Sequence, residues 1–109
     1  MGVVYKVLGQ SAPAATTETA LYTVPAATAT IVSTITVCNR GSTEDYFNLS
    51  VSVGGGATAI TDYVYFSVFV LPHDTFAATI GITMGATDVM RIVSTGGNLT
   101  FSLFGQETS

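Results

Sequence analysis

The chain has 109 residues, of which 48% are hydrophobic and only 9% are charged, and its formal net charge is −4. A chain of this length builds a single core, so we expect one domain spanning residues 1–109. The three basic residues, Lys6, Arg40 and Arg91, lie far apart in the sequence. Phosphate binding needs clustered Lys and Arg, so the composition argues against nucleic acid as a partner.

The single cysteine and the N-terminal segment indicate in which compartment the protein folds. Cys38 is the one cysteine, so no internal disulfide is expected, and we expect it to be a small buried hydrophobe on a strand. The apolar run within the start MGVVYKVLG is too short for a signal peptide. No run in the chain approaches the ~20 apolar residues of a membrane helix. We therefore expect folding in a cytoplasm and no membrane partner.

The residue types and their spacing predict an all-β fold. Thr, Val, Ile, Tyr and Phe dominate and suit a pleated sheet, whereas Leu, Glu and Lys, which favour helices, are scarce. Alternation with period two, bounded by turn residues, predicts about eight strands at residues 3–8, 20–24, 28–38, 46–53, 60–71, 76–84, 89–93 and 99–104. About eight antiparallel strands, each with an apolar face, predict a β-sandwich of jelly-roll or Greek-key type.

The alternation also predicts which side chains face the core. In the third strand we expect Ile31, Ile35 and Val37 on one face and Val32, Thr34 and Thr36 on the other. In the fourth we expect Phe47, Leu49, Val51 and Val53 to point inward and Asn48, Ser50 and Ser52 outward. In residues 76–84 the expected inward row is Phe76, Ala78, Ile80, Ile82 and Met84.

The run YVYFSVFVL at residues 63–71 has almost nothing polar on either face. Regular alternation puts Val64, Phe66, Val68 and Val70 on one face and Tyr63, Tyr65, Phe69 and Leu71 on the other. An ordinary antiparallel strand keeps one face wet, so both faces of this run need cover. We expect the Phe66 face to lie in the core. The face formed by Tyr63, Tyr65, Phe69 and Leu71 is then the predicted interface with another subunit.

No pattern of residues predicts catalysis, a cofactor or a metal site. His73 and Asp74 are neighbours in a turn, and a single histidine excludes paired-histidine metal spacing. Asp62 is expected at an exposed strand end, because a buried position would need a partner such as Arg91. The glycines at 54–56 lack the Lys and helix of a phosphate loop. The five tyrosines suit either sugar stacking or a subunit interface.

Three stretches of the chain carry a resemblance to a known group of proteins. They are YKVLGQSAPAATTETALYTVPAATATIVSTITVCNRG at 5–41, HDTFAATIGITMGATDV at 73–89 and LTFSLFGQE at 99–107. In amino-acid sequence and in their order along the chain, they resemble small phage and prophage virion structural proteins of similar length, and the resemblance covers nearly the whole chain. The resemblance implies a place in the virion after assembly in the host cytoplasm, and it carries over no catalytic residue or cofactor.

The resemblance and the residue pattern together predict a non-enzymatic capsid decoration (cement) protein. It is expected to form a homo-oligomer, a trimer or dimer, seated on other virion proteins such as the major capsid protein. The alternative is a tail-tip, baseplate or fibre component that touches the host receptor. A third class, a glycan depolymerase, would have to use Asp62, the one acid at the start of the aromatic strand.

Overall fold

The computed structural model describes residues 2–109 and shows an all-β chain. Within that range nine strands and two single-turn 3-10 helices follow one another. They are β1 (Val3–Ser11), β2 (Thr19–Thr23), β3 (Ala29–Asn39), β4 (Asp45–Ser52), η1 (Val53–Gly55), η2 (Ile60–Asp62), β5 (Tyr63–Val70), β6 (Thr75–Ala78), β7 (Ile82–Met84), β8 (Val89–Ser94) and β9 (Leu99–Thr108). No helix in residues 2–109 is long and apolar enough to cross a membrane.

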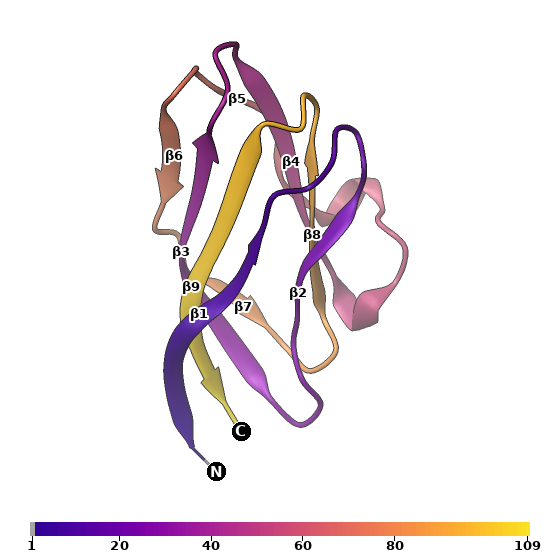
Figure 1. Cartoon of the computed structure of the whole chain (residues 1–109). Helices are drawn as coiled ribbons and strands as arrows, with labels where there is room; N and C mark the ends of the chain where they lie inside the picture. The colour runs from indigo at the N-terminus through magenta and orange to yellow at the C-terminus, as the bar shows by residue number, and fades with distance from the viewer. Residues whose placement is uncertain (1) are drawn as a thin grey trace.

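The strands form two antiparallel sheets that pack face to face. One sheet has the order β1-β9-β3-β6, with β7 also pairing with β3, and the other has the order β2-β8-β4-β5. In Figure 1 the first sheet lies to the left and β2, β8 and β4 lie to the right. The predicted antiparallel β-sandwich is therefore confirmed.

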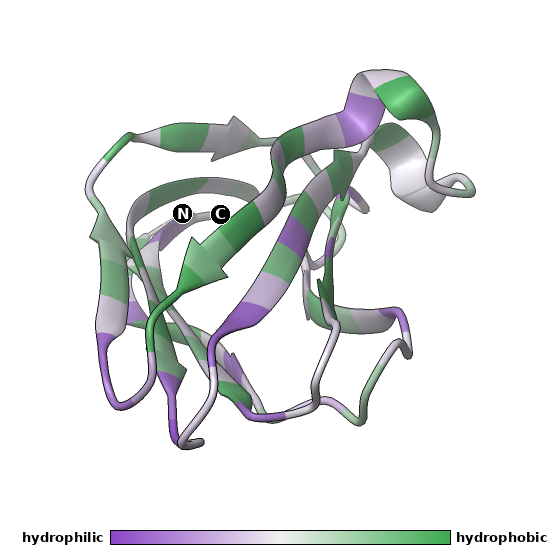
Figure 2. Cartoon of the chain, turned by 90° about the horizontal axis from the view of Figure 1, so that it is seen from above, coloured by the Kyte–Doolittle hydropathy of each residue, from purple (hydrophilic) through white to green (hydrophobic). Residues whose placement is uncertain are grey.

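The core lies between the sheets and is built from the inward rows of both. Figure 2, seen along the sandwich from above, shows hydrophobic and hydrophilic bands alternating along the strands. The largest fully buried side chains are Phe47, Phe101, Ile35, Leu49, Met84, Met90, Ile92, Leu99, Leu103, Val24, Val32 and Val37. Phe47 is central among them, since its ring contacts those of Tyr65, Phe76 and Phe101 at centroid distances of 6.0, 5.3 and 5.7 Å.

The predicted sixth strand is two strands. Gly81, with φ 65°, turns the chain between β6 and β7, which pair with different parts of β3. Positive φ is readily adopted only by glycine, so the break follows from this residue. The expectation that Ile80 faces inward is wrong, because it lies in the turn and is exposed.

A β-bulge in β3 reverses the predicted faces of its first half. The register with β9 shifts between Val32 and Thr34, which leaves Ser33 as the extra residue. Val32 is consequently buried and Ile31 exposed, the opposite of the expected arrangement. Close approach of the backbones here depends on Gly105, because a Cβ atom at that position would collide with the carbonyl oxygen of Ile31.

Cys38 and two serines also lie differently from expectation. Cys38 is exposed rather than buried, because the neighbouring Val37 faces the core and successive side chains of a strand alternate. Ser50 and Ser52 were expected at the surface of β4 but are buried. The segment with η1 and η2 stands outside the second sheet in Figure 1, and Asp62 at its end accepts a hydrogen bond from Ser52. Val53, expected to point inward, is exposed in η1.

Candidate interaction surface

A bulge divides β5 in the middle of its apolar run. The register between β4 and β5 shifts twice, between Phe47 and Leu49 and again between Leu49 and Ser50. On β5 itself Ser67 has φ 52°, a backbone conformation that non-glycine residues rarely adopt. Its amide nitrogen donates to Asn48 Oδ1 at 2.8 Å, so a side chain of the neighbouring strand holds the bulge in place. Side chains before and after Ser67 therefore follow opposite alternations.

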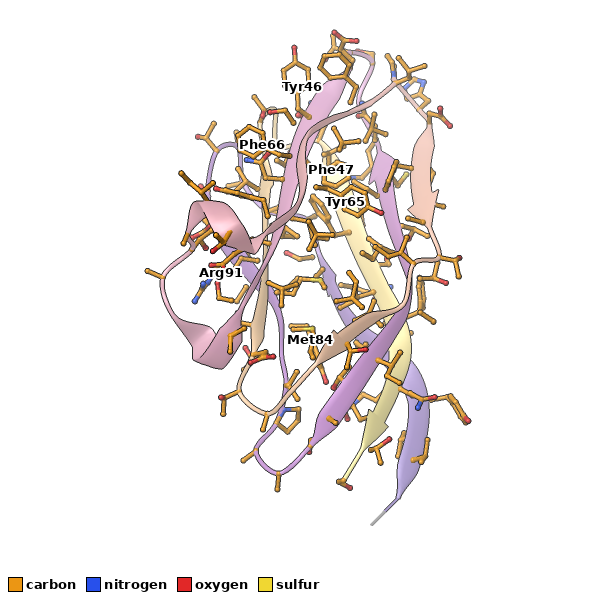
Figure 3. All side chains as sticks on the ribbon, turned by 180° about the vertical axis from the view of Figure 1, so that it is seen from behind. Tyr46, Phe47, Tyr65, Phe66, Met84 and Arg91 are labelled. Atoms are coloured by element: carbon orange, nitrogen blue, oxygen red, sulfur yellow. The ribbon has the colours of Figure 1, made fainter. Side chains whose placement is uncertain are left out.

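The bulge reverses the predicted faces of Tyr65 and Phe66, whereas Tyr63, beyond the second register shift, is exposed as predicted. Tyr65 packs against the core, with its ring centroid 5.3 Å from that of Phe76, while Phe66 is 63% exposed. Figure 3 shows Tyr65 beside Phe47 and Phe66 on the opposite side of the strand. The expectation that Phe66 lies in the core is wrong, and so is the outward placement of Tyr65. After Ser67 the prediction holds, since Val68 packs against the core and Val70 is buried.

An apolar surface results on the outside of β5. We call the exposed side chains Val64, Phe66, Phe69 and Leu71 the β5 outer surface. Neighbouring aromatic rings extend it: Tyr63 lies 5.0 Å from Phe66, and Tyr46 lies 4.5 Å from Phe69, between ring centroids. Of the predicted interface residues, Tyr63, Phe69 and Leu71 are exposed here, and Tyr65 is not. Val64 and Phe66 were missed.

The composition of the β5 outer surface indicates the kind of partner it suits. No charged residue occurs between Tyr63 and Leu71, and Phe66 and Phe69 are each more than half exposed. Contiguous exposed apolar side chains mark protein contacts more often than chance exposure does. Aromatic residues are enriched and charged residues depleted at the centres of protein interfaces. The surface therefore suits an apolar patch of another protein.

Asp62, Ser52 and Arg91 form a polar cluster that fastens the segment at 53–62 to the outside of the second sheet. Asp62 Oδ2 accepts from Ala59 N at 2.9 Å and from Ser52 Oγ at 3.3 Å. Arg91 Nη1 donates to the same Ser52 Oγ at 2.9 Å and to Gly56 O at 2.7 Å. Figure 3 shows Arg91 reaching into this segment. Asp62 is half-buried rather than at an open strand end, and its hydrogen bonds are those of a structural residue.

Asp45, the first residue of β4, is a buried acid. Its side chain accepts hydrogen bonds from Tyr46 N at 2.7 Å, Gly96 N at 2.6 Å, Asn98 N at 3.1 Å and Ser94 Oγ at 3.0 Å. Burial opposes ionisation, but these four hydrogen bonds outweigh it and hold the pKa of Asp45 below its ordinary value. The carboxylate thus joins the start of β4 to the β8–β9 turn.

A second polar cluster joins β1, β2, β3 and β9. The Tyr22 hydroxyl donates to Glu107 Oε2 and lies 2.8 Å from Thr30 Oγ1, and Lys6 Nζ lies 3.2 Å from Glu107 Oε1. Burial, together with the hydrogen bond to Glu107, raises the pKa of Tyr22 to about 12. The hydrogen bond from Tyr22, followed by that from Lys6, lowers the pKa of Glu107. Tyr22 therefore keeps its proton, and the cluster ties strands together.

His73 and Asp74, neighbours in the sequence, lie between β5 and β6. His73 lies in an exposed turn with φ 55°, and Asp74 accepts from Thr75 N at 2.8 Å. Within residues 2–109 no group of three or more His, Cys, Asp and Glu side chains is placed to hold a metal ion.

One open groove lies on the outer face of the first sheet. Its volume is about 580 Å³, and its walls include Tyr5, Val7, Ile31, Phe104 and Gln106. The groove and the β5 outer surface belong to different sheets of the sandwich. No family model matches the sequence, and no curated protein matches it.

Proposed function

We propose that the chain is a non-enzymatic structural protein of a phage virion that decorates and stabilises the capsid. The observation that carries this proposal is the β5 outer surface, an uncharged apolar surface on a chain with only 9% charged residues. Such a surface promotes aggregation of a free protein, whereas in a particle it can be covered by a neighbouring protein and stabilise the contact. The resemblance to small virion proteins over nearly the whole chain supports the same role.

The proposed mechanism is preferential binding to the assembled shell. A ligand that binds only one state stabilises that state through mass action. On a capsid the β5 outer surface would meet a site formed by neighbouring copies of the major capsid protein, so separated subunits would offer only part of the site. Weak contacts suffice when a symmetric oligomer engages several such sites at once. No chemical step is involved.

The strand order supports a finer assignment of the fold, which we include in the proposal. In the sheet with the order β1-β9-β3-β6, the last strand of the chain lies between the first and the third. In the sheet with the order β2-β8-β4-β5, β8 lies between β2 and β4. We assign this arrangement to the jelly-roll type. Jelly rolls occur in viral capsid and lectin domains, which fits a virion protein without requiring catalysis.

The groove on the first sheet favours a second candidate, a tail-tip, baseplate or fibre component that binds a host receptor. Tyr5 supplies an exposed aromatic ring and Gln106 a side-chain amide at one site. An aromatic face beside an amide is suited to a sugar ring, which needs a stacking surface and hydrogen-bond partners. Binding of a host glycan by the purified protein, abolished by Tyr5→Ala, is the result that would favour this candidate.

Copy number in purified virions distinguishes the two candidates. We expect quantitative mass spectrometry to find the chain at a fixed ratio to the major capsid protein, with copies numbering in the tens to hundreds per particle, because a cement protein occupies repeated lattice sites. The major tail protein serves as the internal standard for the other location. A ratio typical of a tail tip or of a single vertex would remove the decoration role.

A further inference from the structure

The N-terminal half of β1 is an open sheet edge. β1 forms the end of the first sheet and pairs only with β9 among the described residues. Every side chain from Val3 to Val7 is exposed, and Tyr5 reaches 79%. In Figure 1 this half of β1 runs beside β9 to the lower end of the molecule, where both termini lie. The backbone groups on the other side of β1 face no other strand.

The hydrogen bonds of the termini show which residues of β1 point to the open edge. Gly2 N donates to Ser109 O at 2.9 Å, and Ser109 N donates to Gly2 O at 3.0 Å, so these two residues form a hydrogen-bonded pair. Such pairs alternate along an antiparallel ladder. Val4 lies opposite Glu107 and Lys6 lies opposite Gly105, so these two pairs are the next hydrogen-bonded pairs along the ladder. The N–H and C=O groups of Val3, Tyr5 and Val7 therefore point away from β9.

The other sheet edges carry features that hinder pairing with another chain, and β1 lacks them between Val3 and Val7. β5 is broken by its bulge at Ser67, and β2 has a register shift between Ala20 and Tyr22. The opposite edge of the first sheet is made of β6 and β7, with four and three residues. Short strands and bulges protect edges, whereas a regular apolar edge is a template for another strand.

Lys6 does not protect the edge in the usual way. An edge lysine normally repels an incoming strand by its charge. Here Lys6 Nζ lies 3.2 Å from Glu107 Oε1, on the strand that already pairs with β1. Its charge is thus compensated within the chain, and the free edge presents Val3, Tyr5 and Val7.

We propose that two copies of this chain pair antiparallel through β1, with the two-fold axis at Tyr5. In this register Tyr5 faces Tyr5 of the second copy, and Val3 faces Val7. These are the residues whose N–H and C=O groups are free, so each donor at the edge meets an acceptor. The two first sheets would join into one continuous sheet. The inference goes beyond the virion role, because it follows from the edge itself and holds in any setting.

The side chains favour a second copy over an unrelated strand. In the register centred on Tyr5, Lys6 lies opposite Val4, so no like charges face each other across the new ladder. The facing pairs are aromatic on aromatic and β-branched on β-branched, which are stabilising cross-strand pairs. The segment is therefore complementary to itself in backbone and in side chains.

The first test uses Tyr5→Pro against Tyr5→Thr, with mass measured by sedimentation across a concentration series. Proline removes an N–H that points to the open edge and none that bonds to β9, so the fold is retained. We expect the wild type to reach twice the 11.3 kDa of the chain, and Tyr5→Pro to raise the dissociation constant at least about tenfold. Tyr5→Thr keeps the N–H, so its dissociation constant is expected to remain closer to that of the wild type.

The register is tested by paired charges that need no proline. Val3→Lys with Val7→Lys puts like charges opposite each other at both ends of the ladder and should give monomers. Val3→Lys with Val7→Glu puts opposite charges there and should restore the dimer. Amide exchange adds a readout, because Val3, Tyr5 and Val7 should gain protection with concentration while Val4 and Lys6 stay protected throughout. A monomeric wild type, a trimer, or equal behaviour of the two charge variants overturns the proposal.

Discussion

Asp45→Asn is expected to lower the free energy of unfolding by about 2–4 kcal/mol at pH 7. The carboxylate is only 2% exposed and accepts from three backbone N–H groups and one hydroxyl. An asparagine keeps one acceptor oxygen and turns an NH2 group toward donors, so at least one buried N–H loses its partner. Chemical denaturation followed by circular dichroism measures the loss.

The stabilisation that the Asp45 carboxylate gives the folded state is lost in acid. The pKa of the folded state lies below that of the unfolded chain, which is about 3.9, so the ionised carboxylate contributes its full stabilisation above about pH 4. The contribution is lost as the pH falls through the folded-state pKa. The gap between wild type and Asp45→Asn should therefore narrow in acid. A gap that stays constant from pH 7 to pH 2 would contradict this account.

Asp74→Asn is the matched control. Asp74 is exposed, and its side chain accepts one hydrogen bond, from Thr75 N at 2.8 Å. The same chemical change should shift stability there by no more than about 0.5 kcal/mol. Equal effects at the two sites would mean that the network around Asp45 is not what stabilises the β8–β9 turn.

Tyr65→Lys is expected to cost about 3 kcal/mol or more, and Phe66→Lys less than about 0.5 kcal/mol. Tyr65 packs on Phe47 and Phe76, so its replacement removes ring contacts and brings a charge toward the core. Phe66 points outward and is 63% exposed, so a lysine there reaches water. Thermal and denaturant unfolding of the two variants gives the comparison.

This pair of variants is sensitive to the bulge at Ser67. Regular alternation through residues 63–71 would put Phe66 in the core and make Phe66→Lys the destabilising change. The reverse order of stabilities would therefore mean that β5 runs without a bulge. Val68→Lys serves as a further control, since Val68 packs against the core in both arrangements.

Much of the fold could be predicted because its strands follow local rules. Phe47 and Leu49 alternate with Asn48 as expected, and the glycines at 96–97 lie in the predicted turn between β8 and β9. The reversed faces in β3 and β5 arise at bulges. Whether Ser33 or Ser67 is inserted as an extra residue depends on the partner strands, and each insertion reverses the faces on one side of it. Local periodicity does not contain that information.

The candidate surface was predicted in part for the same reason. Phe69 and Leu71 follow Ser67 and keep the expected outward direction, whereas Tyr65 and Phe66 precede it and exchange places. Ser67 itself was the available signal, as the single polar residue in an apolar run. The buried role of Asp45 had no comparable signal, because three of its four donors come from residues about fifty positions along the chain.

Two contacts follow for the proposed virion role, one from each sheet. The edge of β1 would join copies, and the β5 outer surface would meet the capsid. A dimer joined through β1 presents two β5 outer surfaces, so each copy strengthens the attachment of the other. Neither contact uses Asp45, Arg91 or Glu107, which hold the sandwich together.

The central claim, that the β5 outer surface attaches the protein to the phage shell, is tested most directly by binding to shells that lack it. Purified wild type, Phe66→Lys and Val53→Lys are mixed with such particles and sedimented together. Val53 is exposed like Phe66 but lies outside the surface, so its variant adds the same charge elsewhere. We expect wild type and Val53→Lys to bind alike and folded Phe66→Lys to bind at least about tenfold more weakly. Undiminished binding of Phe66→Lys, or no binding of wild type, would contradict the account.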